Sequence, residues 1–158
     1  MHRGLLGLSL IALLFLLTGC GAEAAADLSE ICVNGLQIGD PIDGVVKKLY
    51  RPLPEESTDA YTLRFREWRI RADAEGCVDK IFAVCSAVEL LAGEGVPVFF
   101  ISEIDAALGL QKTGSSWFNY EQRLRKSVFC DKTNDLRATF VFAEHDGSLV
   151  FLILERIC

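Results

Sequence analysis

The hydrophobic positions of this chain form one long apolar run near the start and, after it, short segments with strand-like or helical spacing. The apolar run covers residues 5–17 and follows the basic residue Arg3. It is shorter than the roughly 20 apolar residues that a transmembrane helix needs, and no basic cluster follows it. A basic start, an apolar run and small residues after it are typical of a secretory signal peptide, which we favour over a single transmembrane anchor.

The next part of the chain predicts a strand and then a helix. Residues 31–38 are a short strand candidate closed by a glycine. Asp40 can cap a helix, Pro41 suits its first position, and the apolar residues that follow have helical spacing. Pro52 disfavours continuation, so the helix is expected to stop near Tyr50.

Residues 61–71 alternate as a strand, but the phase of the alternation changes midway. Apolar side chains before residue 66 share one face, and those after residue 67 fall on the other. A bulge or a break at this point would return them to one side. A turn signal at residues 73–76 then leads to a further strand at residues 77–85.

The second half of the chain repeats this plan. Residues 89–95 would connect the halves, and Ser102 is expected to cap a second helix that ends at Gly109. A strand candidate and a strong hairpin follow, at residues 117–130, 136–143 and 148–157. The two halves align at the helix and again at the hairpin, which suggests an internal duplication, although two unrelated units could share this similarity.

Leu17-Thr18-Gly19-Cys20 ends the apolar run. These residues resemble the bacterial lipobox, in which the cysteine thiol takes a diacylglycerol and the peptide bond before the cysteine is cut. The resemblance implies a mature protein that begins at Cys20 and often carries an acyl chain, such as palmitate, on its new amino terminus. Gly21 follows the cysteine in place of aspartate, which by the sorting habit of enteric bacteria implies the outer membrane, facing the periplasm.

These patterns together predict the fold class and the organisation of the chain. We expect an α+β fold with a helix packed on an antiparallel sheet, in two related helix-plus-meander units. The expected parts are a lipoprotein signal peptide (1–19), a tether (20–27), a first α+β unit (28–90) and a second α+β unit (91–158).

The charge balance restricts the class of partner. The chain carries 16 basic and 22 acidic side chains, a formal net charge of −6, and loss of Arg3 with the signal peptide leaves 15 against 22, or −7. Nucleic acid and anionic lipid headgroups are bound through an excess of Lys and Arg, so we expect neither as a general partner. Membrane attachment is expected through the lipid on Cys20 alone.

Five cysteines remain after Cys20, and an oxidising compartment permits disulfides between them. An odd number leaves one thiol over. We expect Cys130 to pair with Cys158, because both lie at the outer ends of segments that should belong to one sheet. Cys32 is expected to pair with Cys77 or Cys85. No Cys-x-x-Cys spacing is present, so we expect no metal site.

Residues 35–49, Gly-Leu-Gln-Ile-Gly-Asp-Pro-Ile-Asp-Gly-Val-Val-Lys-Lys-Leu, precede strands and an acidic-glycine hairpin. This arrangement resembles the helix-then-sheet module of the SmpA/BamE-type outer-membrane lipoproteins, which also occurs in tandem in the β-lactamase inhibitor protein family. The resemblance covers residues 33–84 and, more weakly, 100–155. The family helix closes with Leu-Gly-x-Pro, whereas Leu49-Tyr-Arg-Pro52 lacks the glycine. The resemblance implies a non-enzymatic module that binds another envelope protein.

The mature sequence contains few residues or motifs that are typical of catalytic sites. His145 is the one histidine left after the signal peptide, and it lies in a predicted turn beside Asp146. A general base needs a nucleophile and an orienting group in a cleft, which a turn tip does not offer. No glycine-rich phosphate loop, His-Glu-x-x-His or Gly-x-Ser-x-Gly motif is present. We therefore expect no enzyme, no metal and no cofactor.

Two segments are candidates for a partner-binding face. Arg66 and Trp68 lie in an arginine-rich strand, and Trp117, Phe118 and Tyr120 are three aromatic residues within four positions. Arginine and aromatic side chains are favoured at protein interfaces. The alternatives are a solvated sheet face with arginine–carboxylate pairs for the first segment and ordinary core packing for the second.

The sequence predicts a membrane-anchored lipoprotein of the bacterial cell envelope that acts as a non-catalytic protein-binding or structural component. The main alternative is a periplasmic inhibitor or immunity-type lipoprotein that neutralises an enzyme. Both hypotheses require an envelope protein as partner, which the sequence does not identify.

Overall fold

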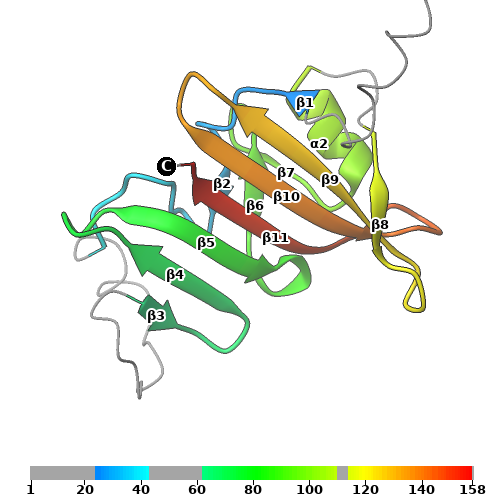
Figure 1. The fold of residues 1–158 in the computed structure, drawn as a ribbon, viewed down its shortest axis with the longest axis horizontal. Coiled ribbons are helices and arrows are strands. Elements are labelled where there is room, and N and C mark those ends of the chain that lie inside the picture. The colour runs from blue at the N-terminus through cyan, green and yellow to red at the C-terminus, as the bar shows by residue number, and fades with distance from the viewer. Residues whose placement is uncertain (1–23, 43–61, 110–113, 158) are drawn as a thin grey trace, which may run out of the picture.

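The computed structural model describes residues 24–42, 62–109 and 114–157, and these residues are mostly β-strand (Figure 1). They form two sheets and contain the α-helix α2 (Ile101–Ala107). The prediction of an α+β fold with two helix-plus-meander units is therefore wrong. Strands from both halves pair with one another, so the hairpins merge into one sheet instead of each supporting a helix. The first predicted helix lies outside the described residues after Ile42.

The large sheet has eight strands in the order β1-β9-β10-β11-β5-β4-β3, and β8 also pairs with β9. Neighbouring strands are antiparallel except β1, which runs parallel to β9. The pairing of β11 with β5 joins the ranges 28–90 and 91–158 in one continuous sheet. The strands are β1 (Ala24–Ala25), β3 (Thr62–Arg64), β4 (Trp68–Ala72), β5 (Val78–Val84), β8 (Ser116–Asn119), β9 (Leu124–Asp131), β10 (Leu136–Ala143) and β11 (Leu149–Arg156).

The second sheet and α2 lie behind the large sheet in Figure 1. This small sheet has the order β2-β6-β7, with β2 at Cys32–Val33, β6 at Leu90–Ala92 and β7 at Val96–Pro97. A short 3-10 helix, η1 (Cys85–Ala87), leads from β5 to β6. The strand expected at residues 31–38 is thus much shorter, and the expected connection at residues 89–95 contains β6.

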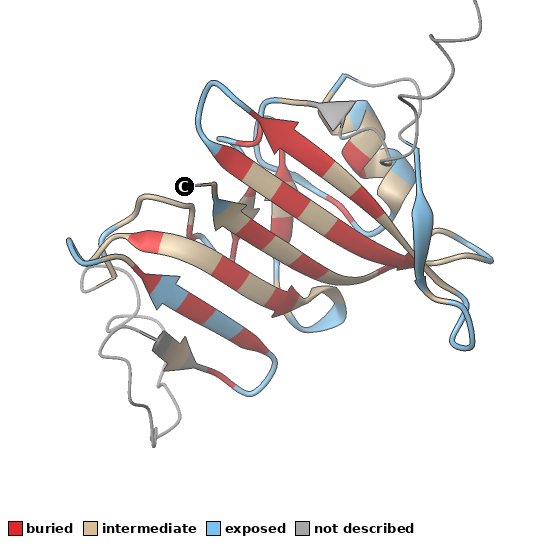
Figure 2. Ribbon diagram, in the orientation of Figure 1, coloured by how far each residue is buried: buried red, intermediate tan, exposed pale blue. Residues whose placement is uncertain are grey.

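The core lies between the inward face of the large sheet and the second layer. Leu136, Ala138 and Phe140 point inward from alternate positions of β10 and are buried, and Ile104 of α2 is fully buried in the same cluster. Figure 2 shows this alternation as red and tan bands along β10 and β11. Phe140 packs edge to face on Phe129 of β9, with ring centroids 5.7 Å apart. The two-residue period of the strands therefore gives the large sheet one buried face.

Several strand predictions are confirmed. The expected strand at residues 77–85 is β5, and the expected final hairpin is β10 and β11. The phase change at residues 66–67 is the turn of a hairpin, because β3 ends before it, β4 begins after it, and Leu63 pairs with Ile70. This turn brings the apolar side chains of both strands to one face.

The segment at residues 117–130 is two strands, not the single strand expected from the sequence. β8 ends at Asn119 and β9 begins at Leu124, and Arg123 in the turn has a φ of 54°. The Asn119 side-chain oxygen accepts a hydrogen bond from the Gln122 N–H at 3.0 Å. An asparagine that bonds to the backbone in this way supports a turn. We call the unit formed by β8, this turn and β9 the β8–β9 hairpin.

The helix α2 is confirmed, but its N-terminal cap differs from the expected one. Phe100 is the N-cap residue, and Ser102 lies inside the first turn. The Glu103 carboxylate accepts hydrogen bonds from the backbone N–H groups of Phe99 (2.6 Å) and Phe100 (3.0 Å). An acid in the first turn thus satisfies amide groups that the helix leaves free. Gly109 follows the helix with a φ of 70°, as expected for its end.

Strand β1 brings residues that the sequence placed in the tether into the sheet. Ala24 pairs with Phe129 and Ala25 with Cys130 at the edge of β9. The Leu28 N–H then donates a hydrogen bond of 2.9 Å to the buried carboxylate of Asp131. The edge of β9 and this carboxylate together attach the start of the described chain to its second half.

Candidate binding surface

The face of the large sheet opposite the core is apolar at its centre. Phe82, Ile153, Thr139 and Val128 lie in one register row across β5, β11, β10 and β9. These four side chains are partly exposed, whereas their sequence neighbours on the core side are buried. We call this surface the outward face, and its partly exposed members are Phe82, Val84, Val128, Thr139, Phe151 and Ile153, of which all but Thr139 are apolar.

The β8–β9 hairpin extends the outward face at one end. Phe118 of β8 is 47% exposed, and its ring meets the Phe151 ring edge to face at a centroid distance of 5.1 Å. Phe151 in turn lies 5.7 Å from Phe82. Three aromatic rings from three strands therefore form a continuous partly exposed surface.

Charged side chains surround the apolar centre of the outward face, and most are basic. Lys80 and Arg137 both bond the Glu155 carboxylate, at 2.8 and 3.0 Å, and Arg71 bonds Asp79 at 2.8 Å. Two further basic residues, Arg69 and Lys126, pair in register with Phe82 and Val141. Five basic residues against two acids give a local charge of 5 − 2 = +3 in a chain whose net charge is −6.

Glu155 is held ionised in this surface. Partial burial of its carboxyl group raises the pKa, but hydrogen bonds and charge attraction from Lys80 and Arg137 outweigh that effect and lower the pKa below its ordinary value. Arg69 forms no ion pair with any residue that the structure describes, and its guanidinium carbon lies 5.9 Å from the centre of the Phe82 ring. The unpaired positive charge lies next to the aromatic centre.

The opposite side of the β8–β9 hairpin carries a second aromatic pair. Trp117 and Tyr120 are 40% and 73% exposed, and their rings meet edge to face at 4.9 Å. The Arg125 guanidinium carbon lies 4.8 Å from the centre of the Trp117 ring. Glu144 of the neighbouring turn bonds Arg123 and approaches Arg125 at 3.9 Å. This pair is held in place by neighbours but remains open to solvent.

Arg66 and Trp68, the two candidate binding residues near β4, lie in different environments. Arg66 is exposed in the turn between β3 and β4. Trp68 is only 6% exposed and stacks on Phe65 with ring centroids 4.4 Å apart, so it belongs to the core. The structure therefore brings Trp117, Phe118 and Tyr120 together in one hairpin but places Trp68 in a different environment. Phe82, Phe151 and Ile153 are not among the residues selected from the sequence, although Phe151 and Ile153 have the two-residue spacing of one strand face.

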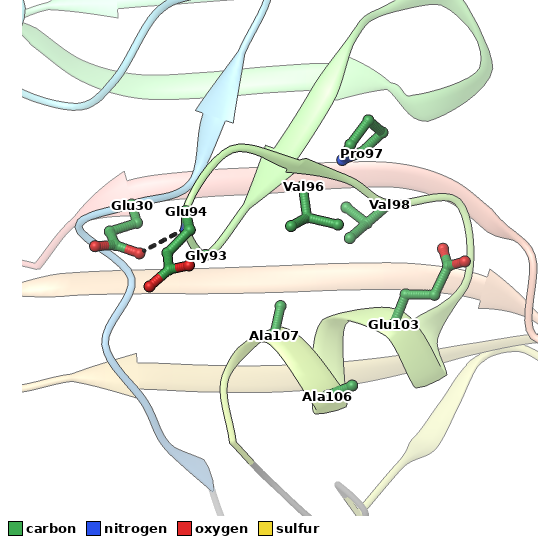
Figure 3. A pocket seen from close by; sticks show the side chains of 9 residues that line it. All are labelled: Glu30, Gly93, Glu94, Val96, Pro97, Val98, Glu103, Ala106 and Ala107. Carbon is green, nitrogen blue, oxygen red and sulfur yellow. Dashed lines mark hydrogen bonds between the residues drawn. The ribbon is translucent and has the colours of Figure 1, made fainter.

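A groove lies between the β6–β7 turn and α2 (Figure 3). Its lining includes the apolar side chain of Val96 and three carboxylates. Glu103 accepts the two backbone N–H groups at the start of α2, and Glu30 accepts the N–H of Glu94 at 3.0 Å. Two of the three acids thus have structural contacts. The lining residues are Glu30, Gly93, Glu94, Val96, Pro97, Val98, Glu103, Ala106 and Ala107.

His145 and the side chains able to ligate a metal ion are the remaining chemical candidates among the described residues. His145 is exposed at the tip of the β10–β11 turn, with its Nε2 atom 3.3 Å from the Asp146 carboxylate. Hydrogen bonds from Ser148 lower the pKa of Asp146 below its ordinary value. No group of three His, Cys, Asp or Glu side chains in the described part of the chain could hold a metal ion.

The structure does not contain the disulfide that the sequence suggested for Cys32. Cys32, Cys77 and Cys85 are free thiols in the structure, so the expected pairing of Cys32 is not present. Burial raises the pKa of Cys85 to about 12 and also raises that of Cys32, which makes both thiols poor nucleophiles at neutral pH. Cys130 is buried on β9, and its expected partner Cys158 lies outside the described residues, as does Cys20.

Comparisons with known proteins add no relative. No family model, no curated protein and no solved structure matches this chain. No helix in the described residues is long and apolar enough to cross a membrane. The resemblance to the SmpA/BamE-type module stays a prediction.

Proposed function

We propose that the protein is a lipid-anchored component of the bacterial envelope that binds another envelope protein through the outward face, without catalysing a reaction. The anchor is inferred from Leu17-Thr18-Gly19-Cys20, and the binding role from the described body. The observation that carries the proposal is the aromatic surface formed by Phe118, Phe151 and Phe82 on the open side of the sheet.

The apolar composition of the outward face supports a protein partner. Large exposed apolar patches on soluble domains commonly mark interaction sites, and aromatic residues and arginine are enriched at the centre of such sites. Arg69 beside Phe82, and Phe118 on Phe151, supply both residue types. Because the strands hold these side chains, the surface is ordered before binding, and little conformational entropy is lost on association.

The charge of the outward face indicates the chemistry of the partner. A local charge of +3 favours a partner surface with an apolar centre and acidic side chains around it, because complementary potentials speed encounter and select the partner. Arg69 and Lys126, which have no carboxylate partner among the described residues, are the side chains available to pair with those acids. We therefore assign the partner as a protein with an acidic and apolar contact surface.

A cross-linked pull-down from solubilised envelopes, with the full-length protein as bait, tests this function. We expect wild type to capture an envelope protein that mass spectrometry identifies, and the double variant Arg69→Glu with Lys126→Glu to capture about ten-fold less of it, because like charges then face each other. Lys132→Glu is the matched control, because Lys132 is exposed in the β9–β10 turn, away from the outward face.

Circular dichroism of all variants checks that the fold is intact. Equal capture by the double variant and by wild type would remove the outward face as the binding surface. If the captured protein is an enzyme and the purified body blocks its activity, the protein acts as an inhibitor through the same face.

A further inference from the structure

We propose that the edge of the large sheet formed by β1 and β8 faces the membrane, with Trp117 and Tyr120 in the lipid headgroup region next to the anchor on Cys20. This inference rests on the lipid anchor of the proposed function and adds an orientation to it. The hairpin is then a second membrane contact besides the lipid anchor. The net negative charge of the chain does not by itself suggest such a contact.

The first argument is that β1 and β8 occupy the same edge of β9. The opposite edge of β9 is taken by β10 along its full length, so both short strands lie on the remaining side (Figure 1). Ala24 pairs with Phe129, and Ser116 pairs with Lys126, three residues away along β9. At about 3.3 Å per residue, these positions are about 10 Å apart along the strand. The start of the described chain and the aromatic hairpin are therefore neighbours.

The second argument is the length of chain between the lipid site and β1. Gly21, Ala22 and Glu23 are the only residues between Cys20 and Ala24. Even a fully extended chain spans at most about 3.6 Å per residue, so the Cα atom of Cys20 lies within about 14 Å of that of Ala24. A bilayer that holds lipid on Cys20 thus lies close to the β1 end of the sheet edge, and not close to the β3 edge on the far side of the sheet.

The third argument is the chemistry of the hairpin. Trp117 and Tyr120 combine an apolar ring with a polar N–H or O–H group, and both residue types are enriched at membrane interfaces. Arg125 lies against the Trp117 ring on this side of the hairpin, and Glu144 balances the charge of Arg123 and Arg125. An amphipathic aromatic pair beside the anchor therefore suits the headgroup region of a bilayer, whereas the basic outward face suits the acidic partner inferred for it.

The two sides of the hairpin separate the two roles. Phe118 turns toward Phe151 and belongs to the outward face, whereas Trp117 contacts both Tyr120 and Arg125 on the opposite side. A protein partner on the outward face and a membrane at the hairpin can therefore be bound together.

Tryptophan fluorescence tests the proposal directly, because the chain contains only two tryptophans, Trp68 in the core and Trp117 in the hairpin. The probe is the mature lipidated protein in vesicles of phosphatidylethanolamine and phosphatidylglycerol that contain lipids brominated near the headgroup end of the acyl chain. In the variant Trp68→Phe, we expect bromolipid to quench Trp117 emission about two-fold. We also expect the emission maximum of Trp117 to lie at a shorter wavelength in vesicles than in detergent-free buffer without lipid.

The matched control is Trp117→Phe, which retains only the core tryptophan and is expected to show no quenching. If Trp68→Phe folds poorly, wild type is used in its place. Any quenching that wild type shows and the Trp117→Phe control does not show then comes from Trp117. Mass spectrometry of the amino-terminal peptide reports lipid on Cys20 in the same samples.

Three results would overturn the orientation. If Cys20 carries lipid but Trp117 is not quenched, the hairpin does not contact the membrane. The anchor and the proposed function then remain intact. An unquenched Trp117 whose emission shifts only when solubilised envelope proteins are added assigns the hairpin to a protein interface. A Cys20 without lipid removes the anchor itself, and with it the basis for this inference.

Discussion

At the residue scale, Trp68 and Trp117 show that the same residue type has opposite roles in two strands of one sheet. Trp68 stacks on Phe65 inside the core, whereas Trp117 lies on an edge hairpin with an arginine against its ring. Each is the first or second residue of a strand. What differs is whether a second layer covers the strand face, which is a property of the fold and not of the neighbouring residues.

Replacement of Trp68 by alanine tests its role in the core. We expect Trp68→Ala to lower the free energy of unfolding by about 3–5 kcal/mol, because it removes a buried aromatic side chain and leaves a cavity. Arg66→Ala, in the adjacent turn, is expected to change it by less than about 0.5 kcal/mol. Urea denaturation of the mature soluble body measures both values. Similar small effects for the two variants would show that Trp68 is not a core residue.

At the element scale, polar contacts with the backbone decide where several elements begin and end. The Asn119 side chain supports the turn that divides the expected strand into β8 and β9, and the Glu103 carboxylate caps α2. The same pattern applies to Asp131, which accepts hydrogen bonds from the backbone of Leu28, Thr133 and Asn134. Short elements in a small sheet protein depend on such contacts because few backbone groups are satisfied within each element.

The N-terminal cap of α2 gives a prediction that distinguishes the capping residue in the structure, Glu103, from the one expected from the sequence, Ser102. We expect Glu103→Ala to destabilise the protein by about 1 kcal/mol, because two backbone N–H groups lose their acceptor. Ser102→Ala, at the residue that the sequence pattern selected as the cap, is expected to change stability by less than about 0.5 kcal/mol. Thermal or urea denaturation distinguishes the two, and the reverse order of effects would contradict the observed cap.

At the scale of the whole molecule, one continuous sheet joins the start, middle and end of the chain. β11 lies between β10 and β5, and β1 pairs with β9 more than a hundred residues later. Positive charge gathers on the outward face, while carboxylates line the groove near α2 on the other layer. The molecule therefore presents surfaces of opposite charge despite its acidic total.

Two carboxylates in this sheet predict how stability depends on pH. Burial raises the pKa of Asp131, but hydrogen bonds from Asn134, Leu28 and Thr133 outweigh it, so the folded pKa lies below the ordinary value, and Glu155 behaves likewise. A group with a lowered folded pKa stabilises the fold above its unfolded pKa of about 4 and loses that contribution as the pH falls through the folded value.

We therefore expect the free energy of unfolding to be nearly constant from about pH 7 to pH 5 and to fall below about pH 4. Asp131→Asn is expected to reduce this dependence on pH and to destabilise the protein at neutral pH by about 1–3 kcal/mol, because a charged acceptor of backbone hydrogen bonds is lost. Denaturation curves at several pH values measure both effects. An Asp131→Asn variant with the pH dependence of wild type would show that this carboxylate does not contribute.

Much of the local structure was predictable from the sequence. The strand at residues 77–85, the final hairpin and α2 follow from apolar periodicity, turn residues and Gly109, all of which act over a few neighbouring positions. The expected α+β class was wrong because similar helix-and-hairpin patterns in the two halves suggested two units. No local pattern indicates that β5 of one half pairs with β11 of the other.

The candidate site was predictable only in part. The run of Trp117, Phe118 and Tyr120 is visible in the sequence, but alternation alone does not tell whether its members are buried. Phe82 and Phe151 are separated by almost seventy residues, and only strand pairing brings their rings together.

The sequence by itself determined the apolar periodicity, the turns, the acidic balance and the lipobox-like residues before Cys20, because each depends on residue type and short-range spacing. Only the tertiary structure decided that Trp68 is buried, that the outward face collects basic and aromatic residues, and that β1 and β8 share an edge of β9. These features depend on which distant strands pair and on which face the second layer covers. Burial of the whole chain selects that pairing, and no short segment carries it alone.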